Sequence, residues 1–299
     1  MGIKIATAPV SWGIFEVEGF GTNKTYSQVL DEMAEAGYSG TELGPYGFLP
    51  TSPDRLQAEL SVRGLHLVSA FVPIPLSEPS ACERAEREVE KVADLLRACG
   101  ATLIVLADAM TPERMAIAGR VFQEPHGLTE DQWRAAADMI MRMARTCAAR
   151  GLRTAFHHHA GTYVETPEEI ERLLALTDPA DVGLCLDTGH YVYGGGDPVD
   201  AVRRFGRRIW HLHLKDVRAP VLDAVRRERL GFLEAVGRGV FCELGEGAVN
   251  IRAVVTALQE ANYDGWAVVE QDVDIRQPGV NPLASARRSR AYLREVIGL

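Results

Sequence analysis

Apolar residues along this chain fall into short runs that alternate with longer segments of helical period. The short runs have the length of β-strands, and we predict strands at residues 3–8, 40–43, 65–71, 103–106, 153–157, 182–186, 209–214 and 266–269. The longer segments predict helices at residues 26–36, 53–63, 83–98, 129–150, 167–176, 198–205, 251–261 and 282–297. This alternation is typical of βαβ units that build a parallel sheet.

Turn-forming residues separate these segments. Pro9 closes the first strand, Thr25 is placed to cap the first helix, and Gly37, Gly64 and Gly151 follow helices. Threonine favours helix N-termini and glycine favours the position just after a helix, so the boundaries agree with the apolar pattern.

Two connections are too long for ordinary turns. Residues 108–128 have no clear period, and a connection of this length is usually functional, such as a lid, or disordered. Residues 217–249 form the second, in which 221–236 could be one surface helix. Because no linker divides the chain, we predict a single (β/α)8 TIM barrel, one α/β domain spanning residues 1–299.

Composition narrows the class of protein. The chain has 299 residues, 46% of them hydrophobic, and a formal net charge of −9, which argues against nucleic acid and anionic membrane surfaces as partners. Five cysteines without CxxC spacing predict free thiols in a reducing compartment. No signal peptide and no apolar run near the roughly 20 residues of a membrane span are visible, so we expect a cytoplasmic protein.

Candidate chemistry lies where the predicted strands end. Active sites of barrels form at the C-terminal ends of the strands, and buried parallel strands are otherwise apolar. Polar residues at or just beyond these ends are Glu42, His157, His158, His159, Asp187, His190, His211, His213, Lys215 and Glu270.

Side-chain alternation sorts the three consecutive histidines. His157 and His159 share a face if the fifth strand extends that far, and His158 points the other way, towards the helices or a loop. The same alternation puts His213 and Lys215 on one face of the seventh strand, inside the barrel.

Four strand ends together indicate a metal site. His157, Asp187, His213 and Glu270 offer mixed nitrogen and oxygen ligands, which suit Mn, Co, Fe or Zn better than calcium or magnesium. One acidic residue alone could be a helix cap or an ion-pair partner, but four successive strands favour a shared ion. His211, deeper in the barrel, could equally be structural.

Several motifs resemble the xylose-isomerase-like barrel superfamily, which contains sugar isomerases, epimerases and apurinic endonucleases. They are residues 187–190 (DTGH), 211–216 (HLHLKD) and 269–270 (VE). Further segments resemble one branch, the myo-inosose (2-keto-myo-inositol) dehydratases: 8–14 (APVSWGI), 41–45 (TELGP), 157–162 (HHHAGT) and 265–272 (GWAVVEQD). The resemblance spans essentially the whole chain.

The resemblance implies a ligand set. The superfamily uses Glu, Asp, His and Glu on strands five to eight, which correspond here to His157, Asp187, His213 and Glu270. Histidine in the first position is similar to the dehydratase branch, and the fourth ligand could be His157, His159 or water. The implied cofactor is a divalent ion, Mn or Co first, with Zn, Fe or Mg as alternatives. The same resemblance implies a homo-oligomer.

The resemblance also implies a dehydratase that removes water from a small polyhydroxy ketone through an enediolate. His159 or Lys215 would act as base, and His190 and Glu42 would orient hydroxyls or donate a proton. Trp12 and His211 are candidate substrate-binding residues, although Trp12 could equally be a core residue. Alternatives are a metal-dependent ketose or sugar-phosphate isomerase or epimerase, an abasic-site endonuclease, which the acidic charge disfavours, and a non-catalytic barrel.

Overall fold

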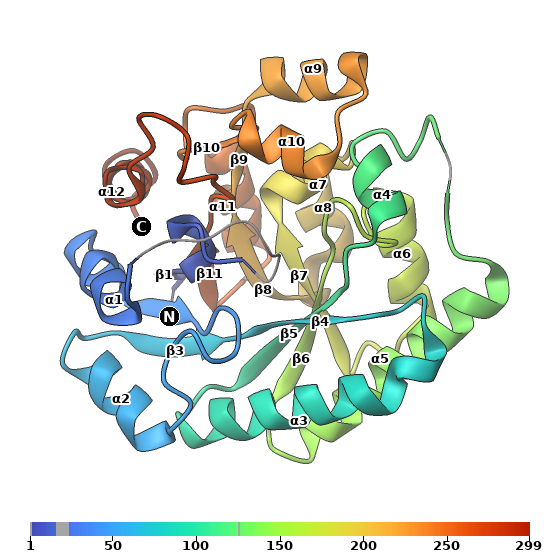
Figure 1. Ribbon diagram of the computed structural model, residues 1–299, viewed down its shortest axis with the longest axis horizontal. Helices are drawn as coiled ribbons and strands as arrows, with labels where there is room; N and C mark the ends of the chain where they lie inside the picture. The colour runs from blue at the N-terminus through green and yellow to red at the C-terminus, as the bar shows by residue number, and fades with distance from the viewer. Residues whose placement is uncertain (1, 16–23, 125) are drawn as a thin grey trace.

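The computed structural model describes residues 2–15, 24–124 and 126–299, and its main element is a parallel sheet of nine strands. The strands follow the order β3-β2-β1-β11-β8-β7-β6-β5-β4 (Figure 1). Their bounds are β1 Lys4–Thr7, β2 Gly40–Glu42, β3 His66–Ser69, β4 Phe71–Ile74, β5 Leu103–Asp108, β6 Arg153–His157, β7 Val182–Asp187, β8 Ile209–Leu214 and β11 Trp266–Val269.

The sheet closes on itself through the third predicted strand. This strand is broken at Ala70 into β3, which pairs with β2, and β4, which pairs with β5. Ala70 itself bridges to β5, because its carbonyl accepts a hydrogen bond of 2.9 Å from the Val105 amide. The fold is therefore the predicted single (β/α)8 barrel. The prediction ended this strand at residue 71, too early, because Pro73 interrupts the apolar pattern.

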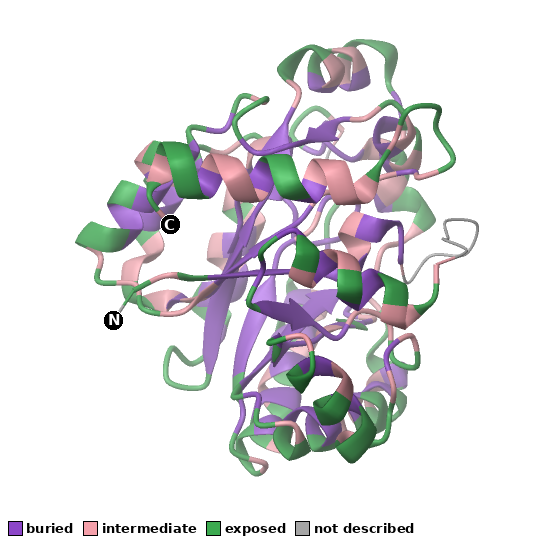
Figure 2. Ribbon diagram, turned by 90° about the vertical axis from the view of Figure 1, so that its left-hand side faces the viewer, coloured by how far each residue is buried: buried purple, intermediate pink, exposed green. Residues whose placement is uncertain are grey.

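The eight predicted barrel helices are present. They are α1 Tyr26–Glu35, α2 Pro53–Ser61, α3 Cys82–Ala98, α5 Glu130–Ala148, α6 Pro167–Leu176, α8 Pro198–Phe205, α11 Ile251–Glu260 and α12 Pro282–Tyr292. Capping boxes begin three of them, at Thr25, Thr129 and Thr166, where the threonine hydroxyl and the third helical side chain satisfy free amides. In Figure 2 these helices turn buried faces to the strands and exposed faces outwards.

The two long connections contain short elements. α4 (Pro112–Ile117) lies in the first, and the second holds α9 (Ala219–Glu228), α10 (Phe232–Gly237) and the paired strands β9 (Asp216–Val217) and β10 (Phe241–Cys242). The single helix expected at residues 221–236 is wrong, because Arg229 adopts a left-handed conformation, with φ of 58°, and ends α9. A further helix, α7 (Thr188–Tyr193), follows β7 directly and was not predicted.

These insertions have a hydrophobic core of their own. The main core joins the barrel strands to the surrounding helices, whereas a second cluster joins α4, α7, α9 and α10. Tyr193, Leu222, Phe232 and Phe241 are among its buried members. Figure 1 shows α4, α9 and α10 gathered at one end of the barrel. We call α4, α9 and α10 the cover.

The cysteines and the helices bear on two predictions made from composition. All five cysteines lie in the described part of the chain and are free. Within residues 2–15, 24–124 and 126–299, the structure has no helix with the length and apolarity that crossing a bilayer requires.

One buried carboxylate ties the cover to the barrel. Asp216, which follows β8, accepts backbone hydrogen bonds from Val217 (2.8 Å), Gly245 (2.9 Å), Gly247 (3.1 Å) and Val249 (2.9 Å). Its two oxygens thereby fix the turn that leads from the cover into α11. Three amides of this turn, and that of Val217 in β9, depend on a single side chain.

We expect Asp216→Asn to lower the free energy of unfolding by about 2–4 kcal/mol, because the new amide group would face two backbone donors in a buried place. Urea unfolding measures this loss. Asp223→Asn on the exposed face of α9 is the matched control and should leave the midpoint unchanged. Equal midpoints for the two variants would contradict this role of Asp216.

Candidate active site

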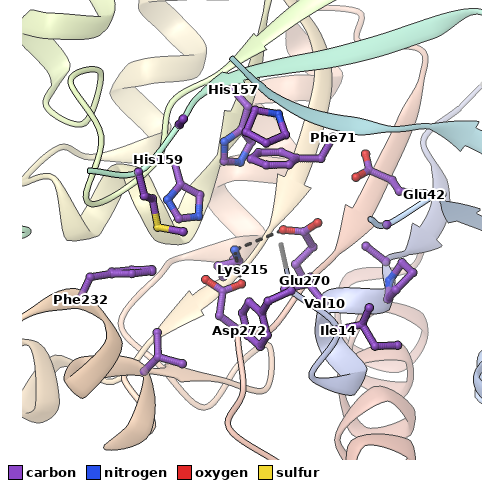
Figure 3. A pocket seen from close by; sticks show the side chains of 18 of the residues that line it. Val10, Ile14, Glu42, Phe71, His157, His159, Lys215, Phe232, Glu270 and Asp272 are labelled. Carbon is purple, nitrogen blue, oxygen red and sulfur yellow. Dashed lines mark hydrogen bonds and ion pairs between the residues drawn. The ribbon is translucent and has the colours of Figure 1, made fainter. Parts of the chain in front are cut away.

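A cavity of about 230 Å³ opens at the C-terminal ends of the barrel strands. Its floor is formed by polar residues at strand ends, namely Glu42, Asp108, His157, Lys215, Glu270 and Asp272. Its walls are apolar, with Val10 and Ile14 on one side and Phe232 and Val236 of α10 on the other. Figure 3 shows Phe232 facing Ile14 across the floor. The cover therefore lies directly over the polar strand ends.

Glu42 orients the histidines of β8. One of its oxygens, Oε1, accepts hydrogen bonds from Ser69 Oγ at 2.6 Å, His211 Nε2 at 2.8 Å and His213 Nε2 at 3.1 Å. Burial favours a higher pKa for Glu42, but the charge and hydrogen bonds of the two histidines outweigh it and hold the pKa well below its usual value. A neutral His213 ring that donates from Nε2 to Glu42 carries its lone pair on Nδ1.

Several buried side-chain atoms that lack a hydrogen bond lie close to His213 Nδ1. His213 Nδ1 lies 3.2 Å from Glu270 Oε2 and 3.8 Å from Asp187 Oδ2, and His157 Nε2 lies 3.5 Å from the same Asp187 oxygen. In the described residues, Nδ1 of His213, Oδ2 of Asp187 and both ring nitrogens of His157 are buried without a hydrogen-bond partner. Buried acceptors of this kind are costly unless paired, and a divalent cation would satisfy them together. The donor set fits a divalent metal ion.

Lys215 brings a fixed positive charge to these carboxylates. Its Nζ lies 3.3 Å from Asp187 Oδ2, 3.2 Å from Glu270 Oε2 and 2.9 Å from Asp272 Oδ1. Burial favours a lower pKa, but the three carboxylates outweigh it and raise the pKa of Lys215 well above its usual range. The side chain is therefore an ammonium group at neutral pH.

The three consecutive histidines point in the predicted directions, although the strand does not extend to His159. His157 and His159 line the cavity, and burial lowers the pKa of both, that of His157 to about 3, so they are neutral imidazoles. His158 points away, where its Nε2 accepts a hydrogen bond of 3.2 Å from the Asp187 amide and its ring packs on Tyr191. β6 ends at His157, so His159 reaches the cavity from the following loop.

The structure does not bring every predicted site residue to the cavity. Trp12 is fully buried in the main core, where its indole donates a 2.7 Å hydrogen bond to Glu32 of α1, and it is not among the described residues lining the cavity. His211 lies below the floor, bound to Glu42. His190 is buried behind His159, with the ring centres 3.8 Å apart.

Asp272 is a site residue that the sequence analysis did not select. It lines the cavity, contacts Lys215, and has one oxygen, Oδ2, buried without a hydrogen bond. A signal existed, because Asp272 stands two residues after Glu270 and alternation would place both on one face. Phe232 gave no such signal, because its position depends on how the cover folds.

Most of this chain matches a known protein family. Residues 30–296 match the model described as xylose isomerase-like TIM barrel.

The chain belongs to the xylose isomerase-like TIM barrel family.

Within this family, the chain is 37% identical to a protein named inosose dehydratase from Geobacillus kaustophilus (strain HTA426), covering 98% of this chain and 94% of that one. Among solved structures, the IolI protein with a bound zinc atom aligns with a TM-score of 0.73 at 15% identity, covering 99% and 98% of the two chains. The probable 3-DHS dehydratase AsbF from Bacillus anthracis aligns with a TM-score of 0.72 at 18% identity, covering 98% and 99%. These two structures support the fold.

In this family member, a glycine makes room for Lys215. A Cβ on Gly189 of α7 would lie 2.6 Å from Cγ and 2.8 Å from Cβ of Lys215. We expect Gly189→Ala to cost about 1–3 kcal/mol of unfolding free energy through overpacking, measured by urea titration. Gly127→Ala, whose added methyl group meets nothing within 4 Å, is the control. Equal stability of the two variants would show that Lys215 can shift freely.

Glu165, in the loop between β6 and α6, should make the stability of the protein depend on pH. Glu165 accepts 2.7 Å hydrogen bonds from the amides of Gly119 and Gly161, and burial raises its pKa to about 7. A raised carboxyl pKa contributes stability that is fully present below the unfolded pKa of about 4.5 and is lost as pH rises through the folded pKa. We therefore compare the free energy of unfolding of the wild type with that of Glu165→Gln at several pH values. The wild-type value minus the variant value should fall as the pH rises to about 7. A difference that grows with pH would contradict this assignment.

Proposed function

We propose that this protein is a metal-dependent hydro-lyase that removes water from an inosose, a ketone of the myo-inositol ring. Full-length identity of 37% to a protein named inosose dehydratase supports the reaction class. The observation that carries the proposal is a group of buried side-chain atoms of Asp187, His213 and His157 that lack a hydrogen bond and lie close to Glu270. Mixed nitrogen and oxygen donors suit Mn or Co, and zinc is a further candidate.

A divalent ion on these residues supplies a Lewis acid for the ketone oxygen and so stabilises the charge that develops when the neighbouring C–H is deprotonated. The side chains around it divide the proton transfers. His159 Nδ1 donates to the Ala160 carbonyl at 2.7 Å, which leaves Nε2 of this neutral ring as the base. The Lys215 ammonium is placed to protonate the departing hydroxyl. Glu42 acts indirectly, by fixing the His213 tautomer.

The charge of the cavity favours an uncharged substrate. Among the described residues, Lys215 is the one Lys or Arg that lines it, beside the carboxyl groups of Glu42, Asp108, Glu270 and Asp272. A phosphate group would meet an excess of negative charge, so a neutral polyhydroxy ketone fits better than a sugar phosphate or a nucleic acid. The proposal includes a cytoplasmic homo-oligomer, whose size light scattering would measure.

The purified protein, stripped with a chelator and reloaded with Mn or Co, should convert 2-keto-myo-inositol to a dione, followed by its absorbance. We expect Glu270→Gln to lower kcat/KM at least about 10²-fold, because one ligand of the ion is lost. The exposed Glu246→Gln is the matched control and should keep full activity.

The opposite outcome identifies the alternative enzyme class. A metal-loaded protein that forms no dione but interconverts ketohexoses would reject the dehydratase reaction and favour an epimerase or isomerase. Equal activity before and after complete metal removal would reject the metal-dependent mechanism.

A further inference from the structure

A further group of side chains with potential metal ligands lies beside the proposed metal site. His159, His190 and Asp272 each offer a ligand atom within 4.8 Å of the others, and none of them belongs to the Asp187, His213 and Glu270 group. His159 Nδ1 lies 2.7 Å from the Ala160 carbonyl oxygen, which leaves Nε2 of that ring as its free nitrogen, and His190 Nε2 lies 3.0 Å from Lys215 Nζ. Two nitrogens and one carboxylate are ligands that transition-metal ions prefer.

The ammonium of Lys215 lies between the two groups. Its Nζ is 3.0 Å from His190 Nε2 and 2.9 Å from Asp272 Oδ1 in the second group. The same atom is close to Asp187 and Glu270 in the first group, at 3.3 and 3.2 Å. One cation therefore contacts the carboxylates of both groups.

The surroundings hold this ammonium in place. The stem of Lys215 packs on Gly189, where no Cβ would fit, and the Phe241 ring centre lies 5.1 Å from Nζ. The Lys215 backbone is bound on both sides by Thr188 Oγ1, which accepts from its amide at 2.9 Å and donates to its carbonyl at 2.7 Å. Lys215 is thus fixed at its backbone, its stem and its charged end.

The negative charge around Lys215 matches the positive charge of one lysine and one divalent ion. Asp187, Glu270 and Asp272 contribute three negative charges at Lys215. The ammonium offsets one of them and a divalent ion would offset the other two, so one lysine and one ion together balance the three carboxylates around Nζ. Asp272 Oδ2 is nevertheless buried without a hydrogen bond and lines the cavity, so the second group keeps an unused acceptor.

We propose that the site has two cation positions, and that Lys215 fills the second, which His159, His190 and Asp272 would otherwise provide to a divalent ion. Lys215 thereby keeps the enzyme mononuclear and leaves the His159 imidazole free of metal. The proposal rests on the proposed metal site at Asp187, His213 and Glu270, and its test separates the two.

Metal content after reconstitution with Mn²⁺ and desalting tests the proposal. The wild type should retain one ion per chain and Lys215→Met two, with the electron paramagnetic resonance spectrum of the variant changing to that of a coupled ion pair. The double variant Lys215→Met with Asp272→Asn should return to one ion. Asp272→Asn alone should keep one ion, because in the wild type Asp272 faces an ammonium.

Each contrary result has its own meaning. A folded Lys215→Met variant, checked by circular dichroism, that retains one ion overturns the second position. Loss of the ion from Asp272→Asn alone also overturns it, because Asp272 would then belong to the first group; this variant decides the question if Lys215→Met does not fold. A wild type that binds no ion rejects the proposed metal site itself.

Discussion

The structure of the site depends on compensating several carboxylates that lie out of contact with water. Asp187 is fully buried, and Glu270 and Asp272 are nearly so, yet all three face the same small volume. Isolated buried charges are costly, so the barrel can hold this cluster only with cations in fixed positions. Lys215 supplies one such cation from within the chain. The remaining negative charge attracts a metal ion, and the low polarity of the surroundings strengthens that attraction.

The cover makes this electrostatic arrangement effective. Phe232 and Val236 of α10 reach the cavity from above, while strands β6, β7 and β8 bring the polar groups from below. An apolar wall over a charged floor limits water and orients a ring whose hydroxyl groups lie at its edge and whose C–H bonds lie on its faces. Asp216 links the two parts, because its carboxylate fixes the turn between cover and barrel.

The sequence predicted the barrel, and selected the residues of the proposed metal site, for one physical reason. A buried parallel strand is apolar, so Asp187, His213 and Glu270 stand out at the strand ends, and alternation assigns their faces. Properties set by distant contacts were not predictable in the same way. Trp12 lies in the core, where its indole donates a hydrogen bond to Glu32 of α1. The break between α9 and α10 occurs at Arg229, a residue type that does not indicate a turn.

The two hydrophobic cores have an evolutionary consequence. Since the cover packs mainly on itself, substitutions at its cavity-facing positions can change which molecule fits without disturbing the layers that hold the barrel together. The residues of the proposed metal site lie on or next to the barrel strands and stay in register while this happens. A lineage can thus exchange substrates by remodelling two insertions and keep its reaction chemistry intact.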